Sequence, residues 1–195
     1  MVIPEGVTSI PYAAFASINT IVNVVIPDSV TSIGTSAFED IESLQYNEYD
    51  NAYYLGNENN PYILLVKVKS TTITSCKINE NCKFINDFAF KNCSNLTSIT
   101  IPDKVISLGY SSFNRCDSLT NITIGKSVNS IGFLSFTNQN MTIYYNGSYN
   151  EWSNIIISSG NNGITGGNKY FYSESNPSDS AYKYWHYVDG VPTAW

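Results

Sequence analysis

Hydrophobic residues in this chain recur at a fixed interval of 23 residues. The segment from Ile78 to Thr100, INENCKFINDFAFKNCSNLTSIT, reappears 23 residues later as IPDKVISLGYSSFNRCDSLTNIT. The same order of apolar positions begins again at Ile124 and, upstream, at Ile3 and Ile26. A period between about 20 and 50 residues is typical of a solenoid, in which each turn of the chain is one structural unit. The pattern therefore predicts a β-rich repeat solenoid.

Equivalent positions of the repeats form ladders of apolar residues. Aligned on the repeated pattern, the coils start at Ile3, Ile26, Tyr49, Ile78, Ile101 and Ile124. The clearest ladder consists of Phe15, Phe38, Phe90, Phe113 and Phe136. Because one coil cannot close a core by itself, we expect these five phenylalanines to stack in one continuous column.

Each coil is predicted to have three parts. Leu96–Ile101 alternates apolar and small polar residues, which favours a β-strand with Thr and Ser on its outer face. Such strands pair in parallel between coils, and Pro102 ends the strand because it lacks an N–H. Residues 105–109 form a short extended piece on the opposite side, where the recurring Gly109 indicates positive φ or close backbone approach. Residues 111–116 then form a short helical or 3₁₀ turn that points Phe113 inward.

The third coil is six residues longer than the others, and the extra residues lie at about 51–71. This stretch reads as a strand at 52–55, a polar turn at 56–60 and a second strand at 61–68. We therefore expect a β-hairpin inserted into the array. Insertions in repeat proteins gather on one face and often carry recognition, although a tolerated decoration is the alternative.

The period fails after residue 143, so residues 1–143 are assigned to the solenoid and residues 144–195 to a C-terminal capping region. Ser148 followed by Glu151 indicates a capped helical turn. Asp189-Gly190 indicates a hairpin turn between two short strands. Solenoids need an atypical last unit, and the aromatic residues of this region are expected to seal the open end of the core.

Composition narrows the function classes. Hydrophobic residues make up 43% and charged residues 13% of the 195 residues, which is typical of a folded domain. The net charge of −6 argues against binding to nucleic acid or to anionic membranes, because both require basic patches. No apolar run approaches the roughly 20 residues that span a bilayer. The chain begins inside a repeat without a signal peptide, so we expect missing upstream coils and self-association through the open N-terminal coil.

Catalytic, metal and cofactor chemistry are not predicted. The four cysteines show no Cys-x₂-Cys spacing, and His186 is the single histidine. A Ser-His-Asp arrangement would have to be built on that one residue, next to Trp185 and Tyr187. Cys93 and Cys116 lie one coil apart, within disulfide reach, so either a disulfide or two buried thiols is possible.

The repeat consensus, LxxIxIPxxVxSIGxxAFxxCxx, resembles the BspA-like, or Treponema-type, class of leucine-rich repeat. The matching residues in one coil are Leu96, Ile99, Ile101, Pro102, Val105, Ser107, Leu108, Gly109, Phe113 and Cys116. The resemblance covers about residues 3–143. It implies a right-handed leucine-rich-repeat coil with a parallel β-sheet, carried by a secreted or cell-surface bacterial protein. Relatives with assigned roles are adhesins that bind host matrix or plasma proteins or that mediate coaggregation, which implies binding rather than a reaction.

The function expected from these patterns is a non-catalytic adhesion scaffold that recognises a protein partner. The candidate binding face consists of outward strand positions and tyrosines near the insertion: Tyr46, Tyr53, Tyr54, Tyr62, Thr97, Thr100, Thr120 and Thr123. One alternative is a glycan-binding module that uses aromatic residues of the capping region, among them Tyr149, Trp152, Trp185 and Trp195. Another is a structural spacer that holds other domains away from the cell.

Overall fold

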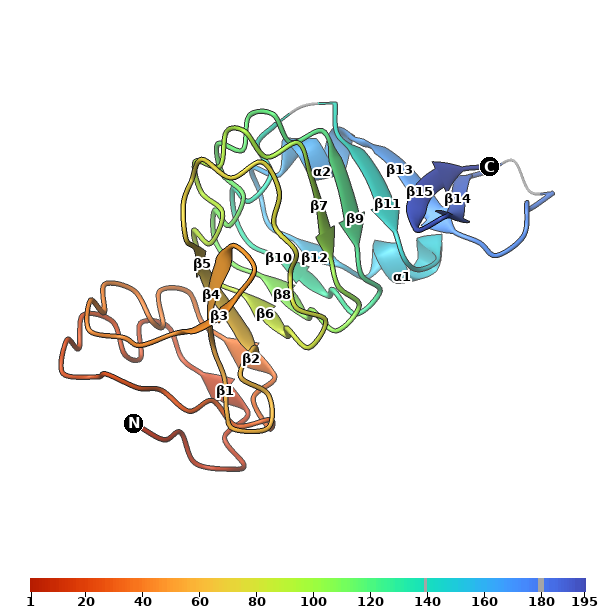
Figure 1. The fold of residues 1–195 in the computed structure, drawn as a ribbon. Coiled ribbons are helices and arrows are strands. Elements are labelled where there is room, and N and C mark those ends of the chain that lie inside the picture. Colours follow the sequence, from red (N-terminus) through yellow and green to blue (C-terminus); the bar gives the residue numbers. More distant parts are fainter. Residues whose placement is uncertain (139, 179–180) are drawn as a thin grey trace.

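The structure, a computed structural model, describes residues 1–138, 140–178 and 181–195 and is a β-solenoid with little helix (Figure 1). One wall of the solenoid is a six-stranded sheet in the order β15-β14-β13-β11-β9-β7. Its strands are β7 (Ser98–Ile101), β9 (Asn121–Ile124), β11 (Thr142–Tyr145), β13 (Asn168–Tyr172), β14 (Lys183–Val188) and β15 (Val191–Ala194). All neighbours pair in parallel except β14 and β15.

The opposite wall is a seven-stranded sheet in the order β12-β10-β8-β6-β5-β4-β3. Its strands are β3 (Asn47–Tyr49), β4 (Ala52–Leu55), β5 (Leu64–Val68), β6 (Phe84–Ile85), β8 (Ser107–Leu108), β10 (Ser130–Ile131) and β12 (Ile156–Ile157). The first two coils contribute a separate pair, β1 (Ser9–Ile10) and β2 (Ser32–Ile33). Two short helices, α1 (Tyr149–Ser153) and α2 (Asn162–Gly166), lie in the last part of the chain.

The predicted repeat register is confirmed in the central coils. Ile99 of β7 lies opposite Ile122 of β9, and Ile101 lies opposite Ile124, a shift of one 23-residue repeat. These isoleucines are buried, whereas Ser98 and Thr100 between them are exposed. The alternation along the sequence therefore separates core from surface, as a half-buried strand requires.

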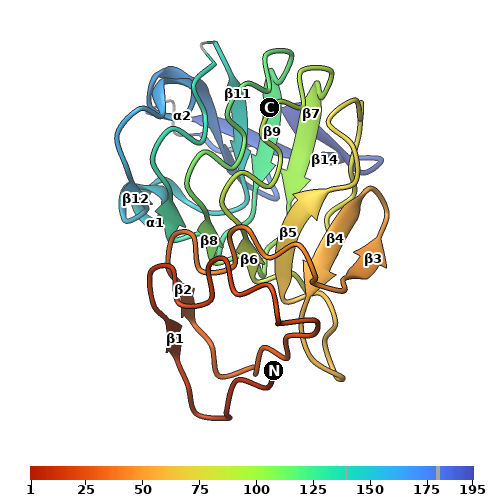
Figure 2. The same cartoon turned by 90° about the vertical axis from the view of Figure 1, so that its left-hand side faces the viewer.

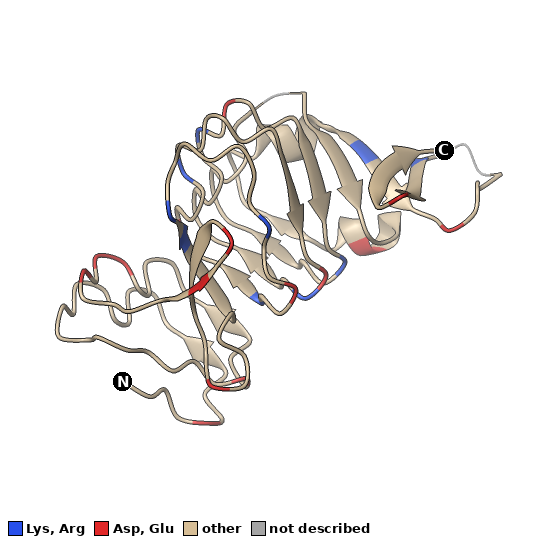
Figure 3. Cartoon of the chain, viewed as in Figure 1, with Lys and Arg blue, Asp and Glu red and all other residues tan. Residues whose placement is uncertain are grey.

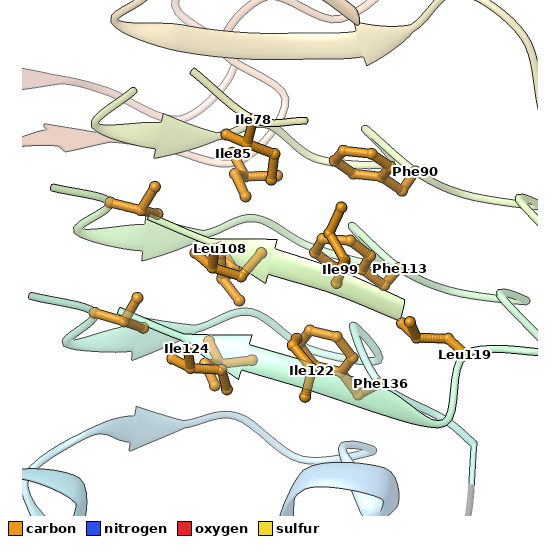
Figure 4. Close-up of a cluster of buried hydrophobic side chains, with 14 of the residues drawn as sticks. Ile78, Ile85, Phe90, Ile99, Leu108, Phe113, Leu119, Ile122, Ile124 and Phe136 are labelled. Carbon is orange, nitrogen blue, oxygen red and sulfur yellow. The ribbon is translucent and has the colours of Figure 1, made fainter. Parts of the chain in front are cut away.

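The prediction of a single column of five phenylalanines is wrong, because the structure contains two separate columns. The rings of Phe90, Phe113 and Phe136 stack in successive coils, with centroid distances of 4.7 Å and 4.9 Å (Figure 4). Phe15 and Phe38 stack separately at 5.4 Å. The buried residues likewise divide into two clusters, one in the first two coils and one in the remaining coils.

The inserted hairpin explains the division. The predicted strand at 52–55 is confirmed as β4, and the second strand, β5, is shorter than predicted. β4 pairs with β5 on the edge that a strand of the preceding coil would otherwise occupy, so β2 pairs only with β1. The first two coils are displaced to one side of the solenoid (Figures 1 and 2).

The displaced coils pack against one face of the seven-stranded sheet. Leu64 and Val66 of β5, together with Phe84 of β6, belong to the core of the first two coils. Leu65 and Ile85, which alternate with them, belong to the core of the solenoid. The segment β5–β6 is therefore a wall shared by two cores, with apolar side chains on both of its faces.

The corners that carry the phenylalanines are tight turns rather than helices. Bonds of the 3₁₀ type occur, as from Asn114 N to Ser111 O at 3.1 Å and from Cys116 N to Phe113 O at 3.3 Å. Ser111 and Arg115 have φ of 50° and 58°, and equivalent residues of other coils also have positive φ. A right-handed helix cannot continue through such residues, so each corner stops after one or two turns.

Close backbone approach accounts for the recurring glycine. A Cβ on Gly109 would lie 2.5 Å from the backbone nitrogen of Asp87 in the preceding coil, and Gly34 and Gly132 show similar contacts. None of these three glycines has a positive φ, so conformational freedom is not the reason for glycine here. Pro11 occupies the equivalent position in the first coil, where the described chain has no preceding coil to contact.

Parallel pairing continues past residue 143, through β12, β13 and β14. The predicted cap of α1 is present, because Ser148 and Glu151 form a reciprocal capping box. The predicted Asp189-Gly190 turn joins β14 to β15. No helix among the described residues has the length and apolarity needed to cross a bilayer.

Candidate binding face

The outer face of the six-stranded sheet, which we call the sheet face, presents two rows of side chains across its strands. The first row is polar and uncharged and consists of Ser98, Asn121, Thr142 and Asn168, which are partners in register. The second row consists of Thr100, Thr123, Tyr144, Tyr170 and Lys183. Strands β7, β9 and β11 carry no charged residue (Figure 3).

Tyrosines dominate the half of the sheet face nearer the C-terminus. Tyr144 and Tyr170 stack with centroids 5.5 Å apart, and the ammonium of Lys183 lies 5.6 Å from the centroid of Tyr170. Both rings are half-buried. Because they stack face to face, the edges and hydroxyl groups rather than the ring faces are presented outward.

An aromatic cluster extends from this row toward the C-terminus and consists of Tyr144, Tyr172, Trp185 and Tyr187. Trp185 is fully buried, in edge contact with the three tyrosines at 5.4, 5.3 and 4.8 Å. Its indole Nε1 donates to the backbone oxygen of Tyr145 at 2.9 Å. Burial raises the pKa of Tyr187, although the Asn146 side chain hydrogen bonds to its hydroxyl. Trp185 is therefore anchored to the sheet by its ring contacts and by its indole hydrogen bond.

The predicted strand residues occupy the sheet face only in part. Thr97, Thr100 and Thr120 are exposed. The prediction that Thr123 belongs to the binding face is wrong, because its side chain is only 4% exposed and cannot contact a partner. Thr123 lies on a central strand, in register with Thr100 on one side and with the larger Tyr144 on the other.

Of the tyrosines near the insertion, Tyr53 and Tyr54 lie on β4 of the seven-stranded sheet, and Tyr46 and Tyr62 lie in the segments that flank its strands. Tyr46 and Tyr53 are half-buried, with their rings 5.3 Å apart. Tyr62 is half-buried and packs against the core of the solenoid. The prediction that Tyr54 contacts a partner is also wrong, because its side chain is fully buried. This burial raises the pKa of its hydroxyl. Adjacent residues of a strand point to opposite faces, so Tyr53 and Tyr54 cannot both face a partner.

Two lysines flank the half-buried pair Tyr46 and Tyr53. The Lys67 ammonium lies 5.3 Å from the ring centroid of Tyr46, and that of Lys69 lies 5.8 Å from the ring of Tyr53. Lys69 also forms an ion pair with Glu48 at 2.7 Å. Tyr46 and Tyr53 therefore form a second, smaller patch, separate from the sheet face.

The aromatic residues of the capping region divide by burial. Trp152 and Trp185 are buried and cannot act as platforms for a ligand. Tyr149 and Trp195 are 42% and 44% exposed. Tyr149 stacks on Tyr182 at 4.3 Å, and Trp195 stacks on His186 at 3.7 Å.

The four cysteine side chains lie inside the core of the solenoid. All four cysteines are buried free thiols. Burial raises the pKa of Cys76 and Cys82 to about 12. Contact with the Cys93 sulfur, together with burial, raises the pKa of Cys116, which keeps it protonated. In the part of the chain that the structure describes, no three His, Cys, Asp or Glu residues are grouped to hold a metal ion.

A coiled array of parallel strands with a polar, tyrosine-rich outer sheet defines a leucine-rich-repeat scaffold. The model of the family described as BspA type Leucine rich repeat region matches residues 1–58 and 68–175, in six copies. The chain therefore belongs to the BspA-type leucine-rich-repeat family, as the repeat consensus indicated. Repeat proteins of this kind are generally protein-interaction scaffolds rather than enzymes.

Solved structures similar to this chain are also leucine-rich-repeat proteins. A leucine-rich repeat protein from Eubacterium ventriosum is 23% identical, with a TM-score of 0.47, over 89% of this chain and 48% of that one. A leucine rich cell surface protein from Faecalibacterium prausnitzii is 24% identical, with a TM-score of 0.37, over 82% and 62%. A leucine-rich repeat protein from T. pallidum is 22% identical, with a TM-score of 0.34, over 74% and 57%. The matches thus cover between about half and three fifths of those chains, and no curated protein matches this sequence.

Proposed function

We propose that this chain is a non-catalytic binding scaffold of a secreted or cell-surface bacterial protein and that it recognises a protein of a host or neighbouring cell. The observation that carries the proposal is the sheet face, where an uncharged polar row runs beside the stacked pair Tyr144 and Tyr170. Tyrosines are enriched among the residues that dominate protein interfaces. Their hydroxyl groups and ring edges contribute contact area at low conformational cost.

Membership of the repeat family supports a scaffold role, and the cell-surface relative from Faecalibacterium prausnitzii supports the proposed location. The charge distribution agrees with a protein partner. A net charge of −6, together with the absence of charged residues from strands β7, β9 and β11, disfavours nucleic acid and anionic lipid.

Glycan binding is the second candidate, and the exposure of Trp195 favours it. One face of its indole is covered by His186, and the side chain is still 44% exposed. Sugars stack on free ring faces, which the stacked pair Tyr144 and Tyr170 does not offer. A glycan site would therefore lie at Trp195 rather than on the sheet face.

The test is binding of the purified chain to immobilised mammalian extracellular matrix and to whole bacterial cells. The double variant Tyr144→Ala/Tyr170→Ala should lose at least about 30-fold in affinity, because even one central interface tyrosine carries roughly 2 kcal/mol or more. Phe133→Ala is the matched control, since Phe133 is 41% exposed and lies outside the sheet face. Unchanged binding of the double variant would assign recognition to another surface.

Two further variants separate the remaining candidates. Tyr46→Ala/Tyr53→Ala tests the hairpin patch, and Trp195→Ala tests the glycan candidate. Binding lost only in Trp195→Ala, and inhibited by free sugars, would replace a protein partner with a glycan. A wild-type chain that binds neither matrix nor cells would contradict the proposed function.

A further inference from the structure

One junction between neighbouring coils is open on the side of the six-stranded sheet. The segment Ser75–Ile78 lies one repeat before β7, where the solenoid pattern would place another paired strand. Instead, β7 is the edge of the sheet (Figure 1). Among the described residues, no backbone hydrogen bond joins Ser75–Ile78 to β7. We call this junction the seam.

The direction of each backbone group along the seam follows from its neighbours. Asn121 N of β9 donates to Thr97 O, and strand groups alternate in direction, so the amides of Ser98 and Thr100 point away from β9 into the seam. On the far side, Lys77 N donates to Asp50 Oδ2, and Ser75 O accepts from the Asn51 side chain at 3.0 Å.

The same alternation places the remaining groups of that segment. Since Ser75 and Lys77 are directed toward the β3–β4 turn, the amides of Cys76 and Ile78 face β7. The edge of β7 and the segment Ser75–Ile78 therefore face each other across the seam, each with backbone groups that have no partner among the described residues.

The two coils are held together on their other sides. β6 pairs with β8, and Phe90 N donates to Ser112 O at 2.7 Å. Asn92 N donates to Asn114 O at 2.9 Å. The seam is thus a local opening in an otherwise paired solenoid, with fixed backbone on each side.

A groove of about 590 Å³ lies along the seam. It is lined by Asp50, Ser75, Cys76, Lys77, Ile78, Glu80, Ser98, Ile99, Thr100 and Pro102. Two carboxylates and one ammonium line it, which gives a local excess of negative charge. The side chains of Cys76, Ile78 and Ile99 are buried, so the accessible surface consists mainly of backbone, small hydroxyl groups and the exposed charged side chains.

We propose that the seam binds an extended segment of a protein partner, which adds a β-strand beside β7 and carries a lysine or arginine toward Asp50 and Glu80. Only a peptide backbone offers donors and acceptors at the spacing of the unpaired groups. The excess of carboxylates makes a basic residue the complementary one. This inference deepens the proposed function and rests on its assignment of a protein partner, but it uses different residues from the sheet face.

Hydrogen exchange of the free protein, followed by NMR, tests the open seam directly. The amides of Ser98 and Thr100 should exchange roughly 100-fold faster than those of Asn121 and Thr123, the matched positions one coil later. Equal protection of the two pairs would show that the seam is closed and would overturn the proposal.

The second experiment uses linear 12-residue peptides selected from a phage-displayed library against the wild-type chain. A selected peptide should protect the Ser98 and Thr100 amides from exchange and should carry a basic residue. Resynthesis with N-methyl groups on alternate residues, in each of the two frames, should weaken binding at least about tenfold in the frame that faces β7. Tolerance of both frames, or failure to select any peptide that protects the seam, would overturn the proposal.

Variants distinguish this inference from the proposed function. Thr100→Pro removes one donor from the seam at an edge position where proline is tolerated, and it should abolish peptide binding. Tyr144→Ala/Tyr170→Ala should leave peptide binding unchanged. If the chain binds matrix but no peptide binds at the seam, this inference is wrong and the proposed function still stands. Dimerisation that already protects the seam amides would identify a second copy as the occupant and contradict a partner peptide.

Discussion

Phe113→Ala tests whether stacked coils share one column of side chains. Phe113 is 1% exposed and lies between Phe90 and Phe136, with ring centroids 4.7 Å and 4.9 Å away. Removing a buried phenylalanine costs about 3–5 kcal/mol, because transfer energy is lost and a cavity remains. Each stacked contact adds about 0.5–1.5 kcal/mol, so we expect the upper part of that range.

Urea denaturation and calorimetry measure this cost. For a chain of this size, a loss of about 4 kcal/mol lowers Tm by roughly 10 °C. Phe133→Ala is the matched control, because Phe133 is 41% exposed and stacks only on Tyr110, at 5.8 Å. The control should cost about 1 kcal/mol or less. Equal losses in the two variants, or a loss below about 1.5 kcal/mol for Phe113→Ala, would refute the shared column.

Four further outcomes are expected. Gly109→Ala should destabilise the fold by about 1–3 kcal/mol, since its Cβ would meet the preceding coil at 2.5 Å, whereas Gly166→Ala, with open space around it, should be nearly neutral in the same urea titration. Ser148→Ala should cost about 1 kcal/mol at pH 7. The Ser148 amide and hydroxyl lower the pKa of Glu151, so the capping contribution is present above the unfolded pKa and is lost as the pH falls through the folded pKa; a cost that grows in acid would contradict this. The four buried thiols should resist a disulfide reagent in native protein and react in denaturant; rapid native reaction would contradict their burial. Exposed apolar side chains of the first coil predict concentration-dependent association, which Tyr12→Lys should weaken in sedimentation experiments; a monomer at every concentration would exclude it.

The repeat period was sufficient to predict the coils, their register and the inward phenylalanines, because a fixed spacing repeats the same local packing. The hairpin and the capping box were also predicted, since each depends on residues close together in the chain. The displacement of the first two coils was not predicted. The displacement depends on whether β4 or β2 pairs with the edge of β5. That competition involves β2, which lies far from β5 in the sequence.

Two signals pointed to the displacement. Phe84 stands where the equivalent outward positions of other coils are Ser32, Ser107 and Ser130, which indicates that something apolar covers it. The continuous run Ile63–Val66 lacks the alternation of a half-exposed strand, as expected for a strand buried on both faces.

The binding face was predicted in part for a similar reason. The exposed threonines of β7 follow from alternation alone. The same rule applied to Thr142–Tyr145 and to Tyr170–Tyr172 would have placed Tyr144, Tyr170 and Tyr172 outside the core. The prediction instead assigned the aromatic residues after residue 143 to sealing the solenoid or, as the alternative, to binding a glycan, and so the tyrosine row was missed.

The wall formed by β5 and β6 has a consequence for cooperativity. In a straight solenoid, each repeat contacts only its two neighbours, and unfolding can travel from one end to the other. Here Leu64 and Leu65 are adjacent in the chain but face different cores, so one strand transmits a loss of packing in either core to the other. The chain should therefore melt as two coupled blocks rather than as a row of independent turns.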